Sequence, residues 1–225
     1  MHIEPGIVDG TKIVLSYATA AAAGGYATKL AVESAREKGV VSLAARTVAT
    51  TALVFSFFEV LPHFPVGVSE VHFIFGSTLF LLFGAAPAAF GLALGLLLQG
   101  LFFVPTDLPQ YGMNVTTLLV PLFAINALAA RIIARDTAYV DLKYRQALSL
   151  SSAYQAGIVA WVAFWAIYGR GLAAENLSSI ATFAGSYMLV IVVEPLVDLA
   201  VLALAKSLRG LSDGLLVTAR LHHPA

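Results

Sequence analysis

The sequence predicts an all-α fold, a polytopic membrane helical bundle of about seven transmembrane helices, and three observations support this class. Of the 225 residues, 59% are hydrophobic and only 12% are charged, about half the charged content of a soluble domain. Seven apolar segments follow one another, and most are long enough to cross a bilayer. The basic residues gather at alternate connections between the segments. We therefore expect one integral membrane domain over residues 1–225.

A helix needs about 20 apolar residues to cross the hydrocarbon core, and most of the seven segments have this length. In order, they cover residues 11–32, 41–61, 70–85, 87–104, 114–134, 148–169 and 178–205. The third is short because it ends at Gly84 and Pro87, and at ~1.5 Å per residue it cannot fill a core of ~30 Å. It is either a true but shortened span or part of one broken helix with the fourth segment.

The basic residues decide between these two interpretations, because cytoplasmic connections are rich in Lys and Arg. Eleven of the 13 basic residues flank the first connection, the fifth connection or the end of the last span. These are Lys29, Arg36, Lys38, Arg46, Arg131, Arg135, Lys143, Arg145, Lys206, Arg209 and Arg220. The opposite side holds only Lys12 and Arg170. Seven spans, with the N-terminus outside and the C-terminus in the cytoplasm, place all three clusters inside, whereas a merged helix would send two of them outside.

Composition also excludes several classes of protein. The net charge is zero, and no basic patch with interleaved aromatic residues suggests a nucleic-acid partner. The absence of cysteine excludes disulfides and thiolate metal sites. The polar start, with Glu4 and Asp9, is unlike a secretory signal, so we expect the initiator end to be retained. No G-x-x-x-x-G-K-[ST] phosphate loop occurs, so we do not expect the chain to power transport with ATP by itself.

The two ends and the histidines complete the expected layout. Residues 1–10 form an extracytoplasmic segment, and residues 206–225 form a cytoplasmic tail in which His222 and His223 are expected to be solvated. His63 is expected to be an ordinary loop residue. His72 opens the shortened third span, and therefore lies below the outer surface, at the floor or wall of a recess open to the outside.

Histidine at position two gives the start of the chain a specific metal chemistry. The α-amine of Met1 and the amide nitrogen of His2 close a five-membered chelate ring, and this amide nitrogen and Nδ1 of His2 close a six-membered one. A second imidazole can fill the fourth corner of the plane, and His72 is the leading candidate. Four nitrogens in a square suit Ni(II) or Cu(II) better than zinc, which prefers a tetrahedron. Pro5 and Gly6 either turn the end back toward such a recess or simply begin a helix.

Three motifs carry a resemblance to a known family. The opening "MHIEPG", the stretch "PVGVSEVHFIFGS" and "YGMN" resemble the membrane substrate-capture components of energy-coupling-factor cobalt and nickel transporters, the CbiM/NikM type. The resemblance implies that the metal is held by Met1, His2 and His72. It also implies that Asn114 and Ser69 lie beside these ligands and help to orient them. Glu70 stands where the family commonly has a small residue, which leaves the metal choice open.

The resemblance also implies a cellular setting. The transported ion is Ni(II) or Co(II), bound at the N-terminus, with no obligatory cofactor and no catalytic activity in this subunit. The implied partners are a transmembrane coupling subunit, separate ATPase subunits and a small accessory membrane subunit. The implied location is the plasma (inner) membrane of a prokaryote, with the metal site facing outside. A role in supplying metal for cobalamin biosynthesis belongs to the same expectation.

Two carboxylates in the last span allow a different function. Glu194 and Asp198 lie one helical turn apart, and charges inside a membrane are costly enough to indicate a role. The preferred interpretation is a buried ion pair with Arg46 and Arg131, which should lie at similar depth. The alternative is a proton relay in a stand-alone proton-coupled metal carrier or channel. A membrane haem subunit that uses two outer-side histidines as ligands, His63 and His72, is a weaker third hypothesis.

Overall fold

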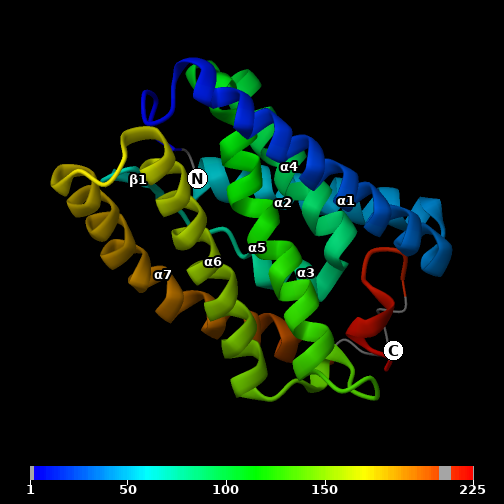
Figure 1. Cartoon of the computed structure of the whole chain (residues 1–225). Helices are drawn as coiled ribbons and strands as arrows, with labels where there is room; N and C mark the ends of the chain where they lie inside the picture. The colour runs from blue at the N-terminus through cyan, green and yellow to red at the C-terminus, as the bar shows by residue number, and fades with distance from the viewer. Residues whose placement is uncertain (1–2, 208–213, 225) are drawn as a thin grey trace.

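The computed structural model describes residues 3–207 and 214–224 of the chain, and Figure 1 shows it as a bundle of helices. Seven α-helices occur in this part: α1 Val14–Lys38, α2 Val40–Val60, α3 Gly76–Phe83, α4 Ala85–Phe102, α5 Tyr111–Ile132, α6 Tyr144–Arg170 and α7 Ala174–Ser207. A hairpin of β1 (Phe64–Val66) and β2 (Ser69–Val71) joins α2 to α3. Short 3₁₀ turns, η1 to η4, cover Gly10–Ile13, Pro105–Gln110, Tyr139–Asp141 and Ala219–Leu221.

The predicted all-α polytopic bundle is confirmed, and five of the described helical segments are long and apolar enough to cross a membrane. They are Val40–Val60, Ala85–Phe102, Pro105–Ile132, Tyr144–Arg170 and Ala174–Ser207. Two helices stand outside this set: α1, whose C-terminal third is rich in charged residues, and α3, which has only eight residues. Eight residues of α-helix reach ~12 Å, far less than a bilayer core.

The third predicted span, residues 70–85, is wrong in its first half. Residues 69–71 form β2, residues 72–75 are not helical, and the helix begins only at Gly76. The prediction that the third and fourth segments form separate helices agrees with the structure, because Gly84 alone joins α3 to α4. Its φ of 90° is a left-handed conformation that glycine adopts without strain.

The helices pack around an aromatic core. α2 packs along α4, while α5, α6 and α7 follow one another as neighbours. Figure 1 shows α6 and α7 on one side of the bundle and α1 on the other. Trp165, Tyr154, Tyr187, Phe58 and Phe183 are fully buried between the helices. Large apolar side chains of α7 remain exposed, as expected for a surface that faces lipid: Met188, Leu189, Val192 and Leu196.

The C-terminal segment 214–224 packs across one end of the bundle (red in Figure 1). The hydroxyl of Ser42 in α2 donates a hydrogen bond to the carbonyl of Leu215, at 2.8 Å. The backbone amide of Thr218 donates to the carbonyl of Leu82 near the end of α3, also at 2.8 Å. This segment therefore supplies partners to backbone and side-chain groups around the junction of α3 and α4.

One expectation for this segment is wrong. His222 was expected to be solvated together with His223, but it is buried, with only 9% of its surface exposed. His223 is exposed, as expected. The difference between the two histidines could not be predicted from the sequence, because burial of His222 depends on the segment folding back onto helices that are distant in the chain.

Candidate metal site

The hairpin that precedes His72 lies directly on α7. β1 and β2 pair antiparallel, with Phe64 opposite Val71. The turn between them contains Gly67, whose φ is +65°. A Cβ atom at this position would lie 2.2 Å from the carbonyl oxygen of Ser179 in α7, so no larger residue fits without displacing one of the two elements. The hairpin is thus held close to α7, and it fixes where the chain continues into His72.

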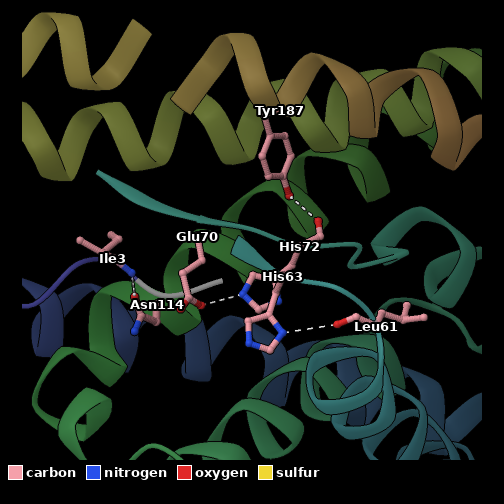
Figure 2. A network of polar contacts seen from close by, with 7 residues as sticks. All are labelled: Ile3, Leu61, His63, Glu70, His72, Asn114 and Tyr187. Atoms are coloured by element: carbon pink, nitrogen blue, oxygen red, sulfur yellow. Dashed lines mark hydrogen bonds and ion pairs between the residues drawn. The ribbon is translucent and has the colours of Figure 1, made fainter. Parts of the chain in front are cut away.

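The first described residues of the chain lie beside this hairpin. Ile3 forms an antiparallel bridge with Ser69, and the amide of Glu4 donates to the carbonyl of Val68 at 3.2 Å. The amide of Ile3 also donates to Oδ1 of Asn114 at 2.9 Å (Figure 2). Ile3, Ser69 and Asn114 are all buried. The structure therefore brings three distant parts of the sequence together: the N-terminal segment, the loop before His72 and the start of α5.

The structure describes only one of the three residues expected to bind metal. Met1 and His2 lie outside the described residues. His72 is described and almost fully buried, with 1% of its surface exposed. Within residues 3–207 and 214–224, no group of three or more His, Cys, Asp or Glu side chains is placed to hold a metal ion. A metal ion bound by His72 would therefore need further ligands that are not part of a His, Cys, Asp or Glu cluster in these residues.

His72 is oriented by a carboxylate and by two rings. Its Nε2 lies 2.8 Å from Oε2 of Glu70 (Figure 2). A carboxylate can only accept, so Nε2 carries the proton, and in the neutral ring Nδ1 is then the nitrogen with the lone pair that a metal needs. The ring of His63 stacks on that of His72, with centroids 4.9 Å apart and planes 5° apart, and Phe58 packs at 5.4 Å.

His72 also contributes to the wall of a cavity of 280 Å³ between the hairpin and α7. The other lining residues are mainly apolar, including Phe64, Val71 and Val190. The expectation that His72 lies at the wall of a recess agrees with the structure in part, since His72 lines this cavity. The residue does not open a helix, however, but lies in the extended stretch between β2 and α3.

His63 lies in a loop, as predicted, and its side chain is exposed. Its stacking on His72 was not anticipated. The arrangement does not match the haem hypothesis, since two haem ligands point their nitrogens toward one iron from opposite sides. Stacked rings instead present their faces to each other.

Acidic side chains give the region around the N-terminal segment a negative potential. Burial raises the pKa of Glu4 above its usual value, and the negative charges of Glu70 and Asp107 raise it further, whereas Arg170 lowers it. A cation that approaches this region is therefore attracted by at least three carboxylates. Glu70 is one of them.

The expected ion pairs of Glu194 and Asp198 do not form. Oε1 of Glu194 accepts hydrogen bonds from the backbone amides of Ile74 and Phe75, at 2.9 and 3.0 Å. Asp198 accepts from the hydroxyls of the first turn of α3. These donors belong to the segment that follows His72. Its non-helical backbone leaves amides without helical partners, so it provides donors closer than any arginine.

The two arginines have other surroundings. Arg46 is buried, and its guanidinium donates to the carbonyl of Phe83 at 2.8 Å and to Oγ of Ser34 at 2.9 Å. Arg131 is exposed near the end of α5. Arg46 therefore completes the hydrogen bonding at the end of α3, and depth in the membrane alone was a poor guide to its partner.

Similarity to known proteins agrees with this fold. The family model described as "CbiM: Cobalt uptake substrate-specific transmembrane region" matches residues 2–210. A solved structure titled as a transition metal transporter aligns with a TM-score of 0.69 at 16% identity, covering 99% of this chain and 96% of that chain. A truncated transition metal transporter aligns with a TM-score of 0.63 at 17% identity, covering 92% and 97%. No curated protein is significantly similar to the chain.

The fold thus defines a polytopic, helical integral membrane protein with a buried histidine beside its N-terminal segment. The chain belongs to the CbiM family, described as the cobalt uptake substrate-specific transmembrane region. At 17% and 16% identity, the two solved structures share the fold of this chain.

Proposed function

We propose that this protein captures a divalent transition metal ion, Ni(II) or Co(II), and that the ion is held by the amine of Met1, by nitrogens of His2 and by His72. The observation that carries the proposal is the bridge between Ile3 and Ser69, three residues before His72. One extended residue spans about 3.3 Å. From the position of Ile3 we infer that the two residues before it can reach the His72 side chain.

The residues around His72 suit this role. Glu70 fixes the imidazole with Nε2 protonated, which leaves Nδ1 as the coordinating nitrogen. Asn114 binds the amide of Ile3, and so holds the chain directly behind the proposed chelate. Glu4, Glu70 and Asp107 attract the cation before it is bound.

The family supports the wider assignment. We infer that the protein is the non-catalytic substrate-binding subunit of an energy-coupling-factor transporter in the plasma (inner) membrane of a prokaryote. A transmembrane coupling subunit, ATPase subunits and a small accessory membrane subunit would be its partners. In this arrangement the ATPase subunits supply the energy, and the metal site faces outside.

A one-residue insertion tests the site. Placing Ala between Met1 and His2 keeps every side chain but lengthens the chelating end. Titration calorimetry of the detergent-purified protein with nickel or cobalt chloride should then show a loss of affinity of about a hundredfold or more, since even residues outside the ligand set affect affinity by 10–100-fold. His72→Ala should behave similarly, and His223→Ala, at an exposed position, is the control. An unchanged affinity in the insertion variant would refute the proposed ligand set.

A further inference from the structure

We propose that Glu194 and Asp198 of α7 are positioning residues for His72, which they hold by binding the non-helical chain that follows it. This inference rests on the proposed function, because it treats His72 as a metal ligand. It gives the two intramembrane carboxylates a role different from an ion pair or a proton relay.

Glu194 binds the chain within three residues of His72. One of its oxygens accepts the amides of Ile74 and Phe75, and the other accepts a hydrogen bond from the side-chain amide of Gln155 in α6. Glu194 is fully buried. A buried carboxylate without such donors would be very unfavourable, so these three hydrogen bonds tie Glu194 to its partners.

Asp198 binds the next part of the same chain. It accepts a hydrogen bond from Oγ of Ser77 at 2.7 Å and another from the hydroxyl of Thr78. Both hydroxyls belong to the first turn of α3, and Asp198 is also fully buried. The two acids of α7 therefore fix both the end of the extended stretch and the beginning of the short helix.

The backbone between these contacts is constrained. Phe75 has a φ of 53°, and among the described residues it is the one non-glycine residue with a positive φ. Such a conformation is unfavourable and persists where the surroundings enforce it. Gly76 follows, and a Cβ atom there would lie 2.1 Å from Cζ of Tyr154, so the chain is pressed against α6. Contacts on both sides thus determine the course of this segment.

α7 presents these contacts along one face. Tyr187, Glu194 and Asp198 are spaced by seven and four residues, which places them on the same side of a helix. The hydroxyl of Tyr187 donates to the backbone carbonyl of His72 at 3.5 Å (Figure 2). A single helix therefore contacts His72 itself and the chain that follows it. In the described part of the chain, neither acid forms a salt bridge, so their charge is compensated by the hydrogen bonds of this segment.

The test measures nickel binding by the full chain in detergent, with nickel chloride as the probe. Glu194→Ala removes all three accepted hydrogen bonds, and Glu194→Gln retains the shape and one oxygen acceptor but not the charge. Glu175→Ala is the matched control, because Glu175 is an exposed glutamate at the start of the same helix. The readouts are the dissociation constant and the ligand-field absorption spectrum of the bound nickel, with His72→Ala as the reference for a lost ligand.

Glu194→Ala should weaken binding by about tenfold or more, and Glu194→Gln should weaken it less, because the neutral amide retains part of the hydrogen bonding. The spectrum of bound nickel should shift toward that of His72→Ala, whereas Glu175→Ala should match the wild type. A purely structural role would lower the melting temperature but leave the dissociation constant and the spectrum of the folded protein unchanged. That result overturns the inference, and Glu194→Gln alone decides if Glu194→Ala does not fold. A wild-type protein that binds neither nickel nor cobalt overturns the proposed function as well.

Discussion

Oε2 of Glu70 lies 2.8 Å from Nε2 of His72, so the side chain two residues before the buried histidine sets which ring nitrogen carries the proton. The carboxylate is partly exposed, whereas the imidazole is buried. This pair gives a physical reason for an acidic residue two positions before the buried histidine.

Replacing Glu70 with Leu should weaken metal binding about 10–100-fold, because the imidazole loses the acceptor that orients it. Glu70→Gln should cost less, since its amide oxygen can still accept from Nε2. Titration calorimetry with nickel chloride measures both effects. Glu33→Gln, an exposed change in α1, is the control. Wild-type affinity in Glu70→Leu would refute the orienting role.

Removing the side chain of Asn114 should loosen the N-terminal segment. Asn114→Ala leaves the buried amide of Ile3 without its acceptor, which should cost about 1–3 kcal/mol of folding free energy. Metal affinity should fall in parallel, because the segment that carries the chelate is no longer fixed. Asn114→Asp keeps an acceptor oxygen at the same place and should retain more of both properties. Thermal unfolding and calorimetry provide the two measurements, and equal losses in both variants would argue against this hydrogen bond.

A methyl group at Gly76 should disturb the chain between His72 and α3. Its Cβ atom would overlap the ring of Tyr154, and overpacking of this kind costs about 1–3 kcal/mol. We expect Gly76→Ala to lower the unfolding temperature. Gly185→Ala is a matched control, because Gly185 lies within helix α7 and a Cβ atom there meets nothing within 4 Å. A similar loss in both variants would show that the close contact is not responsible.

Glu4 provides a prediction on pH. Its pKa is raised above the usual 4.5, chiefly by burial, so the folded protein binds this proton more tightly than the unfolded chain. Its contribution to stability is therefore complete below the usual pKa and is lost as the pH rises through the folded-state pKa. In metal-free protein, Glu4→Gln should raise the unfolding temperature at about pH 7 and have little effect at about pH 4. An equal shift at both values would contradict an electrostatic origin.

Short local motifs in the sequence predicted the residues of the proposed site, and their role in metal binding remains a prediction. His72, Asn114 and Ser69 were selected from short stretches, and the structure places Ser69 and Asn114 against Ile3. The proposed ligands Met1 and His2 remain predictions. The positions of the long helices were also predicted well from the sequence, since long apolar runs determine them directly.

The remaining features of the site could not be predicted from the sequence, because they depend on tertiary contacts. Residues 69–75 are apolar enough to extend a helix. Instead, the hairpin packs closely on α7 at Gly67, and Glu194 of α7 accepts the amide of Ile74 in the extended chain. The depth of Glu194 along α7 could not reveal its partners, because these are backbone amides of a non-helical segment inside the bundle. Gln155, a polar residue within an apolar span, was a signal for such a contact.

The C-terminal segment has a consequence for biogenesis. Its hydrogen bond to Ser42 joins residues 173 positions apart, so the ribosome must have made all seven α-helices before this contact can form. Until then, the carbonyl of Leu82 at the junction of α3 and α4 lacks the hydrogen bond from the amide of Thr218. Insertion into the bilayer can proceed helix by helix, but closure of this end is necessarily among the last events of maturation.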